Sequence, residues 1–197
     1  MVAPALAHLV RSYPNIQVEL SLSTRLADPI RDGFDLVVCK GKLSDSALTI
    51  RPLGSVDSCV FASADYLARR GVPRRPSDLA AHDCILFRAP PRKARWELSG
   101  VSASETVMVT GPLRFDDHGA VAAAVVGGAG LGVLPFHFQH TRPDRAAFVR
   151  VLPRYIVRGE PAQIVYAAAR HVPQRVRLIC DAIVAAVNAQ CPLAERR

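Results

Sequence analysis

The sequence predicts an α/β protein of two lobes, with the second lobe inserted between two halves of the first. The N-terminal region reads as strand, helix and strand, the repeating unit of a parallel sheet. From residue 84 to residue 115 the pattern changes to short strands separated by turn residues, which indicates a second sheet. The last helix is apolar along one face and therefore needs a large partner surface, which the first lobe would supply.

The predicted elements of the first lobe begin with an amphipathic helix at residues 4–13. Residues 16–22 alternate between apolar and polar side chains, which is the period of a strand with one solvent-exposed face. Residues 26–33 are predicted to form a short helix that ends at a glycine, and residues 35–39 a strand covered on both faces.

The second lobe is predicted to begin with strand-like runs around Leu53 and Val60 and a helix over residues 64–70. Ser63 can cap this helix and Gly71 can end it. A proline-rich piece then leads to a short helix at residues 77–81 and to the short strands of the second sheet.

Residues 119–135 read GAVAAAVVGGAGLGVLP, a helix that runs into glycines and then into a buried strand. The helix follows Asp116 and Asp117, whose carboxylates can accept hydrogen bonds from the free N–H groups of its first turn. Since ligands of α/β proteins bind at strand ends and helix N-termini, we expect this segment to face a ligand. The glycine spacing fits neither a phosphate loop, because Val133 and Leu134 replace the lysine and hydroxyl, nor a dinucleotide fingerprint. The sequence thus predicts no nucleotide cofactor.

The chain closes with a predicted strand at residues 163–168 and the apolar helix, whose inward positions are Val176, Ile179, Cys180, Ile183, Val184 and Val187. This helix should return to the sheet of the first lobe. We therefore expect lobe I at residues 1–60 and 164–197, and lobe II at residues 61–163.

Charge, hydropathy and cysteine content predict the protein's binding partners, its location and the state of its thiols. The net charge of +8, from 25 Lys and Arg against 17 Asp and Glu, permits nucleic-acid contact, but the scattered arginines are more typical of a solvated surface. The sequence has no long apolar run and no secretory leader, which predicts a cytoplasmic protein without membrane contact. Five cysteines without Cys-x-x-Cys spacing indicate reduced structural thiols, although Lys40 beside Cys39 would favour a reactive thiolate.

A series of short motifs resembles the effector-binding domain of LysR-type transcriptional regulators, in the order in which that family has them. These motifs are Ser23-Thr24-Arg25, Gly33-Phe34-Asp35-Leu36, Gly41-x-Leu43, Asp45-Ser46-x-Leu48, Tyr66-Leu67 with Gly71-x-Pro73, Asp78-Leu79-x-x-His82, Gly128-x-Gly130-Leu131 to Leu134-Pro135, and Val176-Arg177 with Asp181.

The resemblance implies a two-lobed fold like that of the type 2 periplasmic binding proteins, with a small-molecule effector held between the lobes. It implies sensing without catalysis, a homo-oligomer (dimer or tetramer), and DNA binding through an N-terminal winged helix-turn-helix that is absent from this chain. Because the sequence starts at the first helix, we expect the first strand of lobe I to be missing and Met1 to begin a fragment or to be a misplaced gene start. Cys39 and Lys40 stand where the family commonly has an arginine, and Asp116 replaces a common asparagine.

The expected ligand-binding residues lie at strand ends and at the start of the glycine-rich segment's helix. They are Ser23, Thr24, Lys40 and Gly41 in lobe I, and Arg88, Asp117, His118, Pro135 and Phe136 in lobe II. With two cations among them, we expect an anionic effector.

Catalytic and metal sites are not predicted. His137 and His140 could share a helical face, but a third ligand at fixed spacing is lacking. A hydrolase would need a nucleophile elbow, which the sequence does not contain. The alternatives left open are a solute-binding protein of a transporter and a small α/β enzyme.

Overall fold

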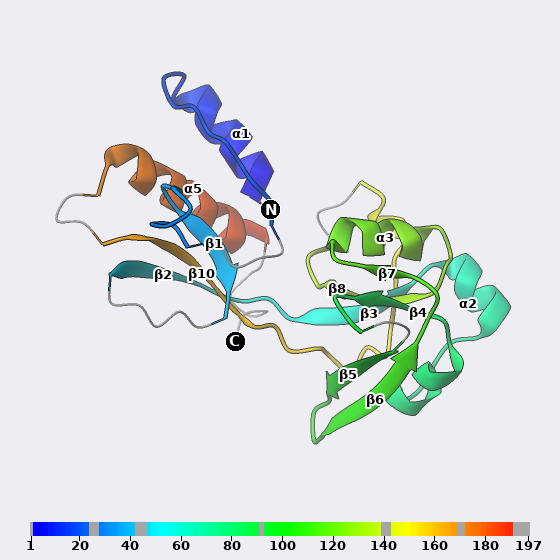
Figure 1. Cartoon of the computed structure of the whole chain (residues 1–197). Coiled ribbons are helices and arrows are strands. Elements are labelled where there is room, and N and C mark those ends of the chain that lie inside the picture. The colour runs from blue at the N-terminus through cyan, green and yellow to red at the C-terminus, as the bar shows by residue number, and fades with distance from the viewer. Residues whose placement is uncertain are drawn as a thin grey trace. The chain divides into compact units, whose positions relative to one another are not determined.

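The computed structural model describes residues 2–23, 28–41, 47–90, 93–138, 143–168 and 172–190. The chain separates into two compact units (Figure 1). Unit 1 comprises Met1–Val56 and Glu160–Arg197, and unit 2 comprises Asp57–Gly159. The boundaries expected from the sequence, 60/61 and 163/164, fall a few residues away, inside strands β3 and β10.

Unit 1 contains a three-stranded sheet in the order β1-β10-β2. Its strands are β1 (Val37–Lys40), β10 (Pro161–Ala167) and β2 (Leu48–Ser55). The last helix, α5 (Gln174–Gln190), covers one face of this sheet, and α1 (Val2–Ser12) lies against α5 (Figure 1).

The core of unit 1 confirms the partner expected for the last helix. Val176, Cys180, Ile183 and Val187 of α5 are buried in one cluster with Leu53 of β2 and Ile164 of β10. Burying a large aliphatic side chain stabilises the fold by about 1.5–3 kcal/mol before entropy is counted, so this face anchors the unit.

Several of the sequence predictions for unit 1 are wrong. Residues 16–22 form no strand, since a strand requires a hydrogen-bonded neighbour and this run has none among the described residues. Leu20 and Leu22 are 47% and 85% exposed. The predicted parallel sheet is also absent there, because β10 pairs with both β1 and β2 in the antiparallel sense.

The predicted helix at residues 26–33 is a series of turns over its described part, residues 28–33. The Asp28 carboxylate accepts hydrogen bonds from the N–H groups of Ile30 (2.9 Å) and Arg31 (3.1 Å), and the Asp28 N–H donates to the Asp32 carboxylate (2.9 Å). Such local side-chain bonds compete with helical ones. The strand that follows is not covered on both faces, because Val38 is 41% exposed.

Unit 2 is built on a five-stranded sheet with both parallel and antiparallel pairs. β4 pairs in parallel with β7 and β8, whereas β3 pairs antiparallel with β8 and β9. In sheet order the strands are β7 (Arg114–Phe115), β4 (Cys84–Phe87), β8 (Leu131–Pro135), β3 (Ser58–Ala62) and β9 (Val149–Val151).

The remaining elements of unit 2 are helices and one hairpin. They are α2 (Ala64–Arg70), the 3-10 helix η1 (Pro76–Ala81), the hairpin β5 (Lys93–Ser99) with β6 (Ser104–Thr110), α3 (His118–Val126) and the 3-10 helix η2 (Arg145–Ala147) (Figure 1).

Strand β3 shows how the sheet separates two cores. Cys59 and Phe61 pack with α3 on one side, while Val60 and Ala62 belong to the cluster that contains Trp96 of β5. Successive side chains of a strand point to opposite faces, so this buried strand serves both cores.

Local signals predicted several elements of unit 2 correctly. The Ser63 hydroxyl accepts the N–H of Tyr66 at 3.2 Å, and Gly71, with φ of +82°, ends α2. The strands expected between residues 84 and 115 are present. Across the described ranges, no helix has both the length and the apolar character needed to cross a bilayer.

Candidate functional site

The candidate site of unit 2 lies where its parallel strands end. Because β7 and β8 both run parallel to β4, their carboxyl ends lie at one edge of the sheet. Arg88 follows β4, Asp116 follows β7, and Phe136 follows β8. Helix α3 begins at the same edge, which is where ligands of α/β proteins commonly bind.

Asp117 holds the start of α3. Its backbone is extended (φ −122°, ψ 132°), and its Oδ1 accepts the N–H of Ala120 at 2.8 Å. Of the two carboxylates that the sequence offers as the cap, Asp116 and Asp117, it is therefore Asp117 that serves as N-cap. One carboxylate oxygen is thus engaged by the helix, and the residue helps to define the helix end at the site.

Arg88 has an unusual backbone conformation. Its φ is +45°, a value that is uncommon outside glycine and that clusters at functional positions. The N–H of Arg88 donates to the Phe115 carbonyl at 2.9 Å, which continues the β4–β7 pairing, and Nε lies 3.4 Å from the Asp116 carbonyl oxygen. The guanidinium sits over the Phe87 ring, 5.2 Å from its centroid.

The charge of Arg88 has no carboxylate partner among the described residues. Arg70 and Arg75 differ in this respect, since they pair with Asp83 at 3.7 Å and Asp78 at 3.0 Å. Arg88 therefore presents an exposed guanidinium at the carboxyl edge of the sheet, able to bind a carboxylate or phosphate in bidentate fashion.

His118 opens α3 and lies among aromatic rings. Its ring centroid is 4.0 Å from that of Phe87 and 6.4 Å from that of Phe138, both in edge-to-face geometry. Arg88 and His118 thus contact the same phenyl ring. Neither Phe87 nor Phe138 is among the predicted site residues, and the only local signal for Phe87 is its position at the end of a strand.

The other two predicted residues of unit 2 lie at the end of β8. Pro135 is buried and pairs with Ser58, and the Phe136 N–H donates to the Asp57 carbonyl at 3.0 Å. The Phe136 ring faces the Arg150 guanidinium, at 5.4 Å. Both residues lie at the same edge of the sheet as Arg88, but the Phe136 ring contacts Arg150 rather than Arg88.

In unit 1 the predicted residues Lys40 and Gly41 end strand β1. Lys40 is exposed, and Gly41 has φ of +90°. Gln163 Nε2 donates to the Gly41 carbonyl at 2.8 Å and lies 4.0 Å from Cys39 Sγ. Gln163 is not among the predicted site residues, but its hydrogen bond to Gly41 holds this turn in place. Ser23 is exposed, and Thr24 lies outside the described residues.

The thiols of both units are poorly suited to redox chemistry. Cys39, Cys59, Cys84 and Cys180 are free and buried, whereas Cys191 lies outside the described residues. Burial raises the pKa of Cys39, partly offset by the Gln163 hydrogen bond, and raises the pKa of Cys84 to about 12. Thiolate formation is disfavoured in both cases, which supports structural thiols. Within the described ranges, no group of three or more metal-binding side chains occurs, and His140 lies outside them.

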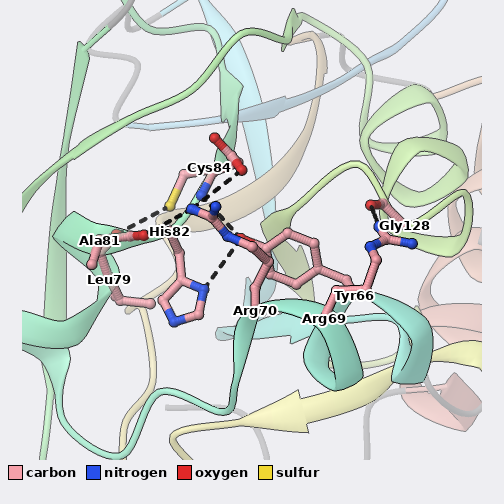
Figure 2. A network of polar contacts seen from close by, with 9 residues as sticks. Tyr66, Arg69, Arg70, Leu79, Ala81, His82, Cys84 and Gly128 are labelled. Carbon is pink, nitrogen blue, oxygen red and sulfur yellow. Dashed lines mark hydrogen bonds and ion pairs between the residues drawn. The ribbon is translucent and has the colours of Figure 1, made fainter.

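A second polar cluster of unit 2 joins α2, η1 and the start of β4 (Figure 2). Arg69 donates to the Gly128 carbonyl at 2.9 Å, and Arg70 donates to the Ala81 carbonyl at 3.1 Å. The Tyr66 hydroxyl forms a hydrogen bond with Nδ1 of His82. Each arginine here is bound to the protein's own backbone. We therefore assign this cluster a structural role.

Comparison with known proteins identifies the family. A family model described as the LysR substrate binding domain matches residues 1–188. The chain belongs to this family. The match confirms the resemblance found in the sequence and makes the chain a ligand-sensing regulatory domain of the LysR type.

Curated relatives support the same assignment. The chain is 26% identical over 183 residues to the HTH-type transcriptional activator AaeR of Escherichia coli K12, covering 93% of the chain and 59% of the relative. It is 31% identical over 178 residues to the HTH-type transcriptional regulator YcaN of the same strain, covering 89% and 58%. The chain thus spans less than two thirds of the length of these transcriptional regulators.

Solved structures place the LysR-type domain in the expected fold class. The regulatory domain of AphB from Vibrio vulnificus is 26% identical, with a TM-score of 0.76 over 94% of this chain and 92% of that one. The regulatory domain of CrgA from Neisseria meningitidis is 23% identical, with a TM-score of 0.81 over 95% and 92%. The predicted α/β fold of the type 2 periplasmic-binding-protein class is therefore confirmed.

Proposed function

We propose that this LysR-type domain senses a small anionic effector that binds at the carboxyl edge of the unit 2 sheet. The observation that carries the proposal is Arg88, whose guanidinium is exposed, lacks a carboxylate partner among the described residues and sits on a left-handed backbone. Asp117, His118, Pro135 and Phe136 complete this part of the site.

The electrostatics of the edge favour an anion. A helix start carries a partial positive charge, and a charge-assisted hydrogen bond to arginine is roughly twice as strong as a neutral one. Asp117 adds a negative charge, but its Oδ1 already accepts the helix N–H of Ala120. The carboxylate of Asp117 can also accept a donor group of the effector, which makes the site mixed in character.

Ser23, Thr24, Lys40 and Gly41 of unit 1 are proposed to supply the remaining contacts. Lys40 is the cation among them, and the turn at Gly41 is fixed by Gln163. A Lys40 variant tests whether the effector also contacts unit 1.

For the whole protein we propose transcription regulation in the cytoplasm, as a dimer or tetramer that binds DNA through an N-terminal domain. The curated relatives are transcriptional regulators, which favours this class over a transport component or an enzyme. Sedimentation of this chain at tens of micromolar tests the association, and a monomer alone would count against it.

Thermal unfolding of the chain with a panel of organic acids tests the site. An effector present at about a hundred times its dissociation constant should stabilise the fold by about 2.7 kcal/mol. Arg88→Gln and Lys40→Gln should each weaken the response. Arg154→Gln, which removes an exposed arginine elsewhere in unit 2, should respond like the parent. If Arg88→Gln also keeps the full response, the edge of the sheet is not the binding site.

A further inference from the structure

The aromatic side chains beside Arg88 point to the chemical class of the effector. We infer that the acid group is carried by a planar aromatic ring, so that the site prefers an aromatic carboxylate. This inference rests on the proposed function, in which Arg88 binds the acid group.

Phe87, His118 and Phe138 form a row of aromatic contacts at the carboxyl edge of the sheet. The Phe87 and His118 centroids are 4.0 Å apart with an interplanar angle of 68°, and those of His118 and Phe138 are 6.4 Å apart at 67°. All three side chains are half-buried rather than enclosed, so each keeps some accessible surface. This sets them apart from Phe61, which is fully buried in the same core.

Arg88 links the row to the charge that would bind an acid group. Its guanidinium lies 5.2 Å from the Phe87 centroid, and Phe87 is in turn the ring that His118 contacts. A guanidinium can bind a carboxylate through its edge while its face rests on an aromatic ring. A ligand whose carboxylate is joined directly to a flat ring would place the ring against Phe87 and His118 when its acid group binds Arg88.

Aromatic character, rather than apolar size, is the property that this row can recognise. Rings that meet edge to face gain from their quadrupoles beyond the area they bury, whereas a saturated ring gains only from burial. Benzoate and cyclohexanecarboxylate form a suitable pair of probes, because both carry one carboxylate on a six-membered ring and only benzoate is aromatic. If the row served only for packing, the aromatic probe would have no advantage.

Titration calorimetry of the chain with the two probes tests the inference. Benzoate should bind roughly two- to tenfold more tightly than cyclohexanecarboxylate, as expected for one aromatic pair. Phe87→Leu keeps an apolar side chain but removes the ring, so it should bring this ratio close to one. Phe115→Leu changes a half-buried phenylalanine of the same core and should keep the ratio. Circular dichroism shows whether Phe87→Leu folds. If it does not, His118→Leu replaces it as the test and should likewise bring the ratio close to one.

The outcomes separate the inference from the proposed function. Equal affinities for the two probes, both reduced in Arg88→Gln, would overturn the aromatic preference and leave the anion site standing. A benzoate preference that survives both Phe87→Leu and His118→Leu would also overturn it, since the row would not be its source. Binding of neither probe, together with no response to any acid of the panel, would overturn both proposals.

Discussion

The Tyr66 hydroxyl lies 3.2 Å from Nδ1 of His82, and both side chains are buried, at 2% and 9% exposure (Figure 2). The same hydroxyl accepts the N–H of Asp83 at 3.0 Å. The hydroxyl can therefore donate its own proton to Nδ1 when the His82 ring is neutral and Nδ1 carries no proton. The pair is therefore satisfied when His82 is neutral and carries its proton on Nε2.

Protonation of His82 would disturb this arrangement, because a protonated Nδ1 can no longer accept the Tyr66 hydroxyl proton. Burial lowers the pKa of His82 below its ordinary value of 6.5, and nearby Arg70 lowers it further. Asp78 and Asp83 act in the opposite direction but do not reverse the shift. The folded state thus favours the neutral imidazole.

The first prediction is a loss of stability in mild acid that depends on His82. Because the pKa is lower in the folded state, the unfolded chain binds a proton first as the pH falls below about 6.5. Stability should therefore decrease from that pH down to the folded-state pKa and then level off for this group. Melting temperatures measured between pH 8 and pH 5 would show the decrease.

His82→Asn serves as the control for this prediction. The asparagine carbonyl can accept the Tyr66 hydroxyl proton but does not titrate, so the variant should depend less on pH over the same range. The other histidines remain and contribute equally to both proteins. Parallel pH curves for the parent and His82→Asn would show that His82 does not cause the loss.

The second prediction concerns the cap at the start of α3. Asp117→Ala removes the acceptor of the Ala120 N–H and should lower the free energy of unfolding by about 1 kcal/mol. Asp117→Asn keeps an acceptor without the charge and should cost only a few tenths of that amount. Urea denaturation of the two variants distinguishes the cap from the charge. An equal loss in both would show that the charge stabilises the helix start.

What the sequence could predict depends on the range of the interaction. Helix α2 was predicted with its bounds because Ser63, Gly71 and the residues between them carry the signal within one segment. The start of α3 at Asp117 is local in the same way. Residues 16–22 show the opposite case, since their alternation fits a strand but a strand also needs a neighbour.

The candidate site was predicted in part for the same reason. Arg88 and His118 were found from their positions at a strand end and a helix start, which are local features. Both residues contact Phe87, although Phe87 and His118 lie far apart in the sequence. The pairing of β4 with β7 and β8 places the end of β4 beside the start of α3, and the sequence does not show this pairing. The positive φ of Arg88 and the role of Gln163 at Gly41 also depend on the assembled fold.

The third prediction tests a close approach of two backbone segments in unit 2. A Cβ at Gly111 would collide with the Cys84 carbonyl oxygen and lie 2.6 Å from its carbon. Backbone atoms cannot move aside as a flexible side chain can, so Gly111→Ala should lower the free energy of unfolding by more than about 2 kcal/mol. Gly127→Ala is the matched control, because Gly127 has φ of −69° and its Cβ would lie 3.3 Å from the Ala123 carbonyl oxygen. Similar denaturation midpoints for the two variants would contradict the close approach.

The last prediction concerns the anchoring of α5 in unit 1. Ile183 is 1% exposed and packs in the cluster with Leu53 and Ile164, whereas Ile179 is only half-buried beside it. Ile183→Ala should lower the free energy of unfolding by about 2–5 kcal/mol, because it removes buried methylene groups and leaves a cavity. Ile183→Val should lose about 0.5–1.5 kcal/mol, and Ile179→Ala should lose less than Ile183→Ala.

Amide hydrogen exchange gives this prediction a readout specific to unit 1. Strands β2 and β10 contribute Leu53 and Ile164 to the α5 cluster, so their amides should lose protection in Ile183→Ala. The amides of β3 and β8, whose side chains pack in the cores of unit 2, should keep their protection. Equal losses of protection in both units would mean that Ile183 stabilises the chain globally rather than through the α5 face, because local packing alone would not spread the effect.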